Sequence, residues 1–262
     1  MKVLVLGNSQ AGALKRAYET RATRDSGIDL HFYVIPGGVG PDLDIVDDRL
    51  VLGAVSPKYP PYVLPVGTDT MPLSSFDAIL VSALGYVDGG YAYKNAITVS
   101  GVLAEFGPRG PATVRAPVSD SCFAEMLAEG LEQQPGVRAL RRLCSACGRP
   151  IFVQPFPHLS DQVAEHPDWG LAQWYDDPLG AHRVMAEAKE AALAALAEGT
   201  GARLLPYPVP HDANRMTPRA MMRETDGVHQ SDAYGALVLD QLESLLTGGD
   251  AGPKETAVAG AT

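Results

Sequence analysis

The chain begins with Met1-Lys2 and then Val3-Leu4-Val5-Leu6-Gly7-Asn8-Ser9-Gln10, and this stretch decides the fold. Four consecutive apolar residues that end at a glycine are typical of a short strand buried on both faces, as strands of a parallel sheet are. The residues that follow, 11–24, contain helix formers with apolar side chains at helical spacing, which predicts a helix. The stretch therefore indicates the first strand–turn–helix unit of an α/β protein.

The same alternation of apolar runs and helical patterns continues along the chain. It predicts further strands at 28–35, 76–84, 150–155 and 202–207, and further helices at 119–146, 180–198 and 231–246. Because parallel neighbours need a long crossover, this order predicts an α/β fold with a mostly parallel five-stranded sheet. At 262 residues we expect one domain over 1–247, followed by a small, polar tail, 248–262, that is predicted to be disordered.

Three long insertions interrupt this alternation, at 39–75, 86–118 and 156–179. Each follows the carboxyl end of a predicted strand, the edge where ligands bind in open α/β sheets. Long loops in a compact domain are usually functional or disordered, so we interpret these three as walls of a substrate pocket. Within the first insertion, short apolar runs at 50–55 and 62–66 predict a small hairpin.

Charge and hydropathy exclude several classes of partner. Lys plus Arg number 21 and Asp plus Glu 31, a formal charge of −10, whereas nucleic acids and acidic membrane surfaces require a positive surface. The sequence shows no apolar run long enough for a secretory signal or a membrane span, so we expect a cytoplasmic protein that binds no membrane. The three cysteines, Cys122, Cys144 and Cys147, are then expected to be reduced thiols.

Ser9 is a candidate nucleophile because it falls on the turn between the first strand and the first helix. At the N-terminus of a helix, unpaired N–H groups and the helix dipole favour the negative charge that develops during attack on a carbonyl. Two alternatives remain for this turn. Ser9 could cap the helix, and Gly7 with Gly12 has part of a phosphate-loop spacing, although Ala13 and Leu14 stand where that loop needs Lys and Ser or Thr.

Asp226 and His229 lie three residues apart just before the last predicted helix. A general base needs an imidazole that reaches the hydroxyl, and a carboxylate that fixes its tautomer assists it. A lone D-x-x-H is common by chance, and its other interpretation is a turn with a solvated histidine. With Ser9, these residues supply all the parts of a Ser-His-Asp nucleophile.

The two segments together resemble the SGNH (GDSL-like) hydrolase superfamily. Gly7-Asn8-Ser9 is similar to its G-D-S block, with Asn in place of Asp, and Asp226-Gly227-Val228-His229 matches its D-x-x-H block. The resemblance implies a three-layer, flavodoxin-like fold and assigns Ser9, Asp226 and His229 as the catalytic residues. It also implies that Gly38, or Gly37 beside it, and Gly85 lie at the oxyanion hole.

The resemblance implies hydrolysis of a small-molecule ester or thioester through an acyl-enzyme, with no cofactor and no metal. One position departs from the family: Val87 stands where an asparagine would donate a hydrogen bond to the oxyanion. Losing one such donor costs about 10²–10³ in rate. This leaves open an acyltransferase of the same fold, or a weakly active relative that binds a small molecule.

Two other groups of residues could in principle form metal or redox sites. Cys144 and Cys147 form a C-x-x-C without the further ligands of a zinc site, which favours partly buried thiols. His158, Asp161, His166, His211 and Asp212 could meet at the loop edge of the sheet, but their spacing matches no metal motif, so we interpret them as polar residues at the edge of the pocket. His158 comes three residues after the predicted strand at 150–155, so it is expected to lie near the pocket as a substrate-binding residue.

Overall fold

The computed structural model describes residues 1–21, 27–34, 43–52, 62–64, 70–84, 105–107, 119–165, 175–223 and 226–248. Within these ranges the strands are β1 (Lys2–Gly7), β2 (Asp29–Val34), β3 (Leu43–Val46), β4 (Arg49–Leu52), β5 (Tyr62–Leu64), β6 (Thr70–Pro72), β7 (Ala78–Leu84), β8 (Ile151–Pro155), β9 (Arg203–Leu204), β10 (Met222–Arg223) and β11 (Asp226–Gln230). The α-helices are α1 (Ala11–Arg21), α3 (Asp120–Glu132), α4 (Pro135–Ala146), α5 (Pro178–Thr200) and α6 (Asp232–Leu246). Short 3-10 helices include η1 (Leu73–Ser75), η3 (Asp161–Ala164) and η5 (Arg219–Met221).

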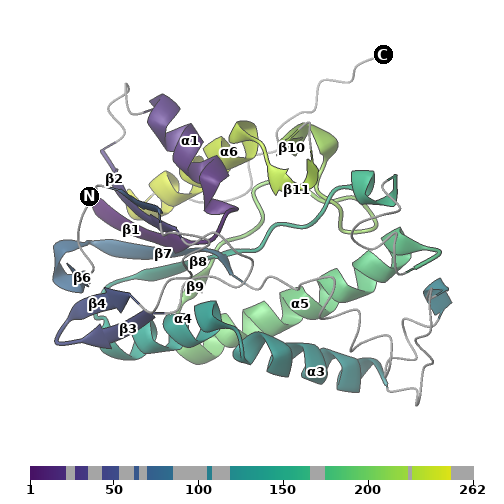
Figure 1. Cartoon of the computed structure of the whole chain (residues 1–262), viewed down its shortest axis with the longest axis horizontal. Helices are drawn as coiled ribbons and strands as arrows, with labels where there is room; N and C mark the ends of the chain where they lie inside the picture. The colour runs from purple at the N-terminus through teal and green to yellow at the C-terminus, as the bar shows by residue number, and fades with distance from the viewer. Residues whose placement is uncertain are drawn as a thin grey trace.

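Six strands form the main sheet, in the order β5-β2-β1-β7-β8-β9 (Figure 1). The pairings from β2 through β9 are all parallel, and β5 adds an antiparallel edge strand beside β2. Numbered along the chain, the five parallel strands have the order 2-1-3-4-5, the flavodoxin-like arrangement. The prediction of an α/β fold with a mostly parallel five-stranded sheet is confirmed, and β5 is an addition to it.

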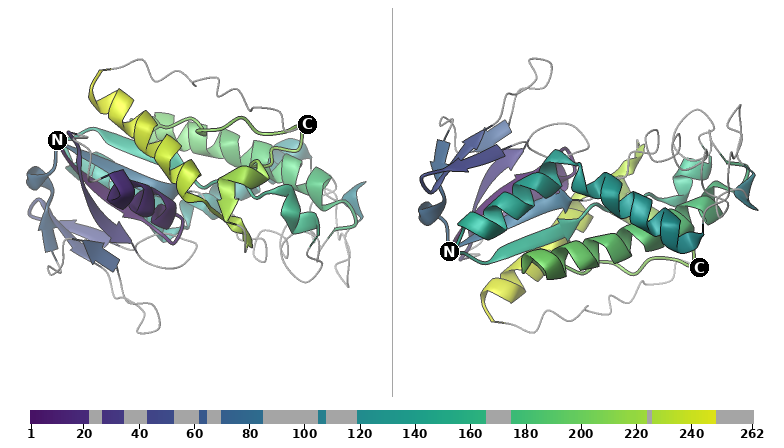
Figure 2. Two further views of the ribbon diagram at one scale, coloured as in Figure 1. Left: turned by 90° about the horizontal axis from the view of Figure 1, so that it is seen from above. Right: turned by 90° about the horizontal axis from the view of Figure 1, so that it is seen from below.

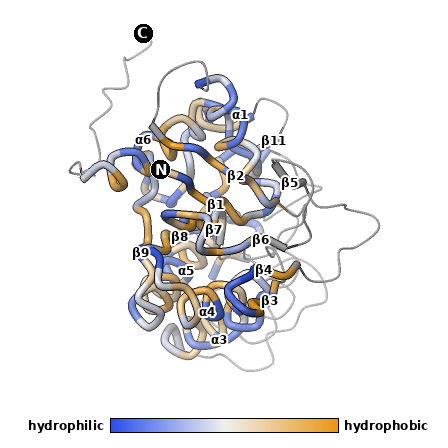
Figure 3. The backbone as a smooth tube through the Cα atoms, turned by 90° about the vertical axis from the view of Figure 1, so that its left-hand side faces the viewer, coloured by the Kyte–Doolittle hydropathy of each residue, from blue (hydrophilic) through white to orange (hydrophobic). Residues whose placement is uncertain are grey.

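Helices cover both faces of the sheet, so the domain has three layers. α1 and α6 lie on one face, and α3, α4 and α5 lie on the other (Figures 1 and 2). Side chains of β1 alternate between the two: Val3 and Val5 pack in the cluster with α1 and α6, and Leu4 and Leu6 pack in the cluster with α4 and α5. The hydrophobic colour of β1 through the centre of the molecule (Figure 3) follows from this burial on both faces.

α1, close to the N-terminus in sequence, packs against α6 from the C-terminal part of the chain (Figure 2). A Cβ added at Gly235 would lie 2.2 Å from the carbonyl oxygen of Ala13, so only glycine allows this approach. Across the same contact, Arg16 pairs with Asp232 and Arg21 pairs with Asp240. The turn before α1 and the strand before α6 therefore lie side by side, although about 220 residues separate them in sequence.

The predicted single helix at 119–146 is wrong, because the structure has two helices there. α3 ends at Glu132 and α4 begins at Pro135, with Gln133 and Gln134 between them. Proline has no N–H to donate and its ring clashes with the preceding turn, so it cannot continue a helix but suits the first position of a new one.

The predicted hairpin between 50–55 and 62–66 is also wrong in its pairing. β4 pairs with β3 and with β6, whereas β5 joins the main sheet beside β2. The β3–β4 hairpin turns at Asp47 and Asp48, whose φ values of 50° and 60° are those of a type I′ turn. Asp is less common there than Asn or Gly, which explains why the sequence pattern did not show this turn.

Several sequence expectations fall outside the described residues. These include most of the insertion 86–118, residues 166–174 of the third insertion, and the predicted tail beyond Gly248. No helix in the described part of the chain is long and apolar enough to cross a membrane.

Candidate active site

Ser9 follows the carboxyl end of β1, the strand at which the sheet changes direction: the chain goes from β1 to β2 on one side and later continues from β7 on the other side. Such a position is the topological switch point of an open α/β sheet. β1 ends at Gly7, and a Cβ there would lie 2.9 Å from the Cβ of Ala11 and 3.2 Å from that of Ser82. The backbone can turn this tightly against β7 only because the residue is glycine. The turn that follows exposes Ser9 at the carboxyl edge of the sheet.

The side chain of Asn8 closes this turn. Asn8 is fully buried; its Oδ1 accepts from the N–H of Gln10 at 3.0 Å, and its Nδ2 donates to the carbonyl oxygen of Ala83 at 3.1 Å. An aspartate could make the first bond but would direct a carboxylate oxygen at the Ala83 carbonyl. The geometry therefore explains why Asn stands at this position, and it leaves the Ser9 hydroxyl available for another partner.

That partner is His229. Its Nε2 lies 3.3 Å from Oγ of Ser9, slightly beyond the 2.6–3.2 Å of a catalytic hydrogen bond, and such contacts are often looser without substrate. His229 lies on β11, immediately before α6, and is partly exposed. The structure thus brings together the predicted nucleophile and the predicted base.

Asp226 is the first residue of β11, three residues before His229. The pairing of β11 with β10 is irregular: Met222 pairs with Gln230, but the next residue, Arg223, pairs with Asp226. The irregularity therefore spans the segment that carries His229, as bulges beside active sites commonly do. The side chain of Asp226 lies outside the described part of the structure, so its role stays a prediction.

Three further residues of the predicted site also lie outside the described residues. They are the predicted oxyanion-hole glycines, Gly38 and Gly85, and Val87, which stands where the family has an asparagine. The end of β7 that leads toward Gly85 is distorted. Ala83 has φ of 58°, an uncommon conformation for a residue with a side chain, and the pairing of β7 with β8 shifts register between Val81 and Leu84. Backbone strain of this kind tends to occur at functional sites.

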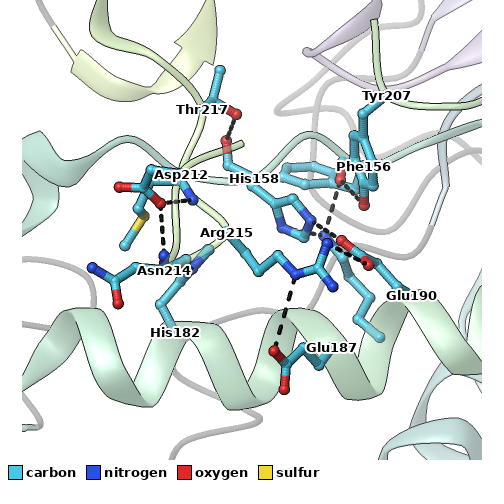
Figure 4. A network of polar contacts seen from close by, with 12 residues as sticks. Phe156, His158, His182, Glu187, Glu190, Tyr207, Asp212, Asn214, Arg215 and Thr217 are labelled. Atoms are coloured by element: carbon cyan, nitrogen blue, oxygen red, sulfur yellow. Dashed lines mark hydrogen bonds and ion pairs between the residues drawn. The ribbon is translucent and has the colours of Figure 1, made fainter. Parts of the chain in front are cut away.

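The structure places His158 in a second group that we call the histidine cluster. It comprises the buried residues His158, His182 and Lys189 and the half-buried residues Glu190, Tyr207 and His211 (Figure 4 shows most of it). The His158 ring is 1% exposed and packs against those of Tyr207 and His211, at centroid distances of 4.6 and 4.5 Å. Its Nε2 donates to the carboxylate of Glu190 at 2.8 Å, because a carboxylate can only accept. Its Nδ1 therefore carries no proton and accepts from Nζ of Lys189 at 3.2 Å.

Burial keeps the imidazoles of the cluster neutral. Desolvation first, and the charge of Lys189 second, lower the pKa of His158 far below its usual value. Desolvation also lowers the pKa of His182 to about 4 and that of His211 to about 4. Desolvation lowers the pKa of Lys189 to about 7, although Glu190 beside it favours the charged form.

The other residues weighed with His158 have separate roles. Asp161 pairs with Arg219 at 2.7 Å on the surface, and Asp212 accepts from the N–H groups of Asn214 and Met216 at 2.8 Å each. His166 lies outside the described residues. His182, Lys189 and Glu190 were not predicted from the sequence. His182 and Lys189 lie seven residues apart, a spacing that places them on one face of a helix and could have indicated them.

The cluster and the Ser9–His229 pair are linked through the loop after β8. Thr217 donates its N–H to the carbonyl of Leu159 and its hydroxyl to that of His158, both at 2.8 Å. The loop continues into η3, which contacts β11. The cluster thus anchors a segment that packs beside the strand of His229.

Comparison with known proteins identifies no family for this chain. No protein-family model matches the chain, and no curated protein does. Among solved structures, a Lactobacillus plantarum protein from a structural genomics consortium is similar at 13% identity and a TM-score of 0.40, over 94% of this chain and 96% of that one. A DUF4886 family protein from Bacteroides uniformis is similar at 12% identity and a TM-score of 0.40, over 97% of this chain and 88% of that one. At this level of similarity neither supports an assignment of function.

Proposed function

We propose that the protein is a serine-dependent acyl-ester or thioester hydrolase of the SGNH type. The observation that carries the proposal is the approach of Nε2 of His229 to Oγ of Ser9 at 3.3 Å, at the switch point of a flavodoxin-like sheet. Ligands of such sheets bind at this edge. A nucleophile within reach of a general base, both partly or fully exposed there, is the arrangement that acyl transfer requires.

In the proposed reaction, His229 accepts the proton of Ser9 as Oγ attacks the carbonyl carbon of the substrate. Asp226 is assigned to orient the imidazole, and the backbone N–H groups of Ser9 and Gly38 to stabilise the oxyanion, with Gly85 beside them in the substrate site. The tetrahedral intermediate expels the alcohol or thiol, which takes the proton from His229. Water, deprotonated by His229, then attacks the acyl-enzyme and releases the carboxylic acid and Ser9. This chemistry requires no cofactor or metal. We also propose that the protein is cytoplasmic.

An acyltransferase of the same fold is the second candidate. The same acyl-enzyme would then pass its acyl group to an alcohol or amine instead of water. A weakly active relative that only binds a small molecule is the third. The acyl acceptor distinguishes the first two, and formation of the acyl-enzyme distinguishes both from the third.

The test is labelling with a serine-directed fluorophosphonate, measured by intact mass and located by peptide mapping. We expect one adduct, on Ser9, in the wild-type protein and none in Ser9→Ala or His229→Ala. His31→Ala is a matched control, because His31 pairs with Asp29 on β2 and is expected to leave labelling unchanged. A folded wild-type protein that forms no adduct, or a His229→Ala protein that labels at the wild-type rate, would contradict the proposal.

A further inference from the structure

Three side chains that can ligate metals meet in the histidine cluster, each from a different segment. They are His158 from the loop after β8, Glu190 from α5 and His211 from the loop after β9. One possible ligand atom of each lies within 4.8 Å of the other two. Within the described residues this is the one group of three or more His, Cys, Asp or Glu side chains that meets this distance.

We propose that these three side chains bind a divalent transition-metal ion of the zinc type. Two imidazoles and one carboxylate are a donor set that such ions prefer, with a fourth position left for water. Both imidazoles are neutral, which is the form that ligates metals. Binding of the ion at Nε2 of His158 would move the ring proton to Nδ1. Lys189 would then release one proton to solvent and accept the hydrogen bond from Nδ1.

An unused donor atom supports the site independently. Nε2 of His211 is buried, and in the described part of the chain no hydrogen-bond partner lies within reach of it. A buried polar atom without a partner costs about 1–3 kcal/mol. A metal ion between His211, His158 and Glu190 would remove this cost.

Each proposed ligand is held in place by its own segment. Thr217 fixes the loop at His158 and Leu159 by donating one hydrogen bond to the carbonyl oxygen of each, and Glu190 lies within the long helix α5. His211 begins a turn that the carboxylate of Asp212 closes by accepting from two N–H groups. A site whose ligands are held in this way loses little conformational entropy on binding.

The charges that face the site are mixed, with carboxylates in excess. Lys189 lies 3.2 Å from Nδ1 of His158, and the guanidinium of Arg215 lies 3.6 Å from Glu190 (Figure 4). Three carboxylates oppose these two cations: Glu190, Glu187 at 4.0 Å from Arg215, and Asp212 beside His211. An ion held by Glu190 would compete with Arg215, whose side chain is 43% exposed and can turn toward solvent.

A bound ion would connect the loop after β8, α5 and the loop after β9. Because the first of these loops leads to η3 beside β11, the ion would stabilise the segment that packs against the strand of His229. The inference concerns a structural ion and does not depend on the proposed hydrolase activity.

The experiment is a zinc titration of the full chain, prepared without a histidine tag and treated with EDTA, by calorimetry and by metal analysis after dialysis. We expect one zinc ion per chain and a higher Tm with zinc. Removing even a partner of a ligand costs about 10–100-fold in metal affinity, so we expect Glu190→Gln and His211→Gln to raise the Kd by at least about 10-fold. Circular dichroism confirms that each variant is folded, and Glu190→Gln has the same shape as the native residue.

Three controls separate the proposed site from others. His182→Gln changes an imidazole of the same cluster whose Nδ1 bonds to the carbonyl of Asn214, and it is expected to keep the affinity. A variant with Cys144→Ser and Cys147→Ser tests the C-x-x-C, and Ser9→Ala tests the candidate active site; both are expected to bind zinc normally. Failure of the wild-type protein to bind one ion, unchanged binding in Glu190→Gln and His211→Gln, or loss of binding in the cysteine variant would overturn the inference.

Discussion

The Ser9–His229 pair and the histidine cluster both place an imidazole beside polar partners, but in opposite surroundings. Ser9 is exposed and its contact to His229 is 3.3 Å long, whereas His158 is buried and bonded at both ring nitrogens. A ring that exchanges protons during catalysis needs access to substrate and water, whereas a ring that holds three segments together needs a hydrogen-bond partner at each nitrogen. The comparison teaches that the burial of a histidine and the number of its hydrogen-bond partners indicate whether it can act as a base.

The largest expected effect tests the exposed pair. Ser9→Ala should lower hydrolysis of an activated ester, such as a p-nitrophenyl ester, by at least about 10⁴-fold, because it removes the nucleophile. Its free energy of unfolding in urea should change by less than about 0.5 kcal/mol, since the residue is exposed and Asn8 closes the turn. Turnover comparable to that of the wild-type protein would show that the pair is not the catalytic centre.

The next effect tests the buried cluster through pH. His182 has a pKa of about 4 when folded and about 6.5 when unfolded, so between these values the unfolded chain binds more protons. Stability is therefore complete above pH 6.5 and falls as the pH is lowered toward 4, by about 3 kcal/mol for this residue alone.

Urea unfolding at several pH values measures this slope. His182→Gln, which cannot titrate, should show a shallower slope over the same range, and His31→Ala, outside the cluster, should keep the wild-type slope. Equal slopes in all three proteins would mean that the cluster is hydrated and its imidazoles are not held neutral.

Asn8 combines features of the two regions. It is buried and hydrogen-bonded through both ends of its side-chain amide, yet it is the neighbour of the exposed Ser9. Asn8→Ala should lower the free energy of unfolding by about 2 kcal/mol, since the carbonyl of Ala83 and the N–H of Gln10 both lose a buried partner. It should also slow ester hydrolysis, because the Ser9 turn is no longer fixed. Asn8→Asp keeps the acceptor and loses the donor; if it were as stable as the wild-type protein, the Ala83 bond would be unimportant.

The smallest expected effect concerns the surface between α1 and α6. Arg16 and Asp232 form a pair whose side chains are 38% and 59% exposed, so Arg16→Ala should cost less than about 1 kcal/mol. Thermal unfolding at low and high salt measures it, and the difference from the wild-type protein should shrink as salt rises. A larger, salt-independent loss would mean that the Arg16 stem contributes packing between the helices.

Much of the fold could be predicted because the sequence of its central strand, β1, is a short apolar run that ends at a glycine. The run Val3–Leu6 faces a helix layer on each side and so is apolar at every position. Ser9 and His229 could also be paired in advance, through the resemblance of their segments to two blocks of one family, but the strand that carries His229, β11, was not predicted. The break before Pro135 was visible in the sequence and was overlooked in favour of one long helical pattern.

The rest depended on contacts between distant segments. The role of Asn8 depends on where the carbonyl of Ala83 lies, which follows from the distorted end of β7. The histidine cluster joins His158, Glu190 and His211 from two loops and a helix, at a spacing that no local pattern encodes. Residues 62–64 pair with β2 at the edge of the main sheet, and this pairing between separate segments is not visible in the local sequence pattern.

The packing of Gly235 on Ala13 has a consequence for synthesis on the ribosome. The chain emerges with Ser9 first and His229 about 220 residues later, and the packing of α6 on α1 holds the segments that carry them side by side. Under the proposed function, a nascent or prematurely terminated chain that lacks His229 and α6 carries a nucleophile without its general base. Under the proposed function, enzymatic activity would begin only when translation has reached the last helix, so unfinished chains would be unable to cleave esters.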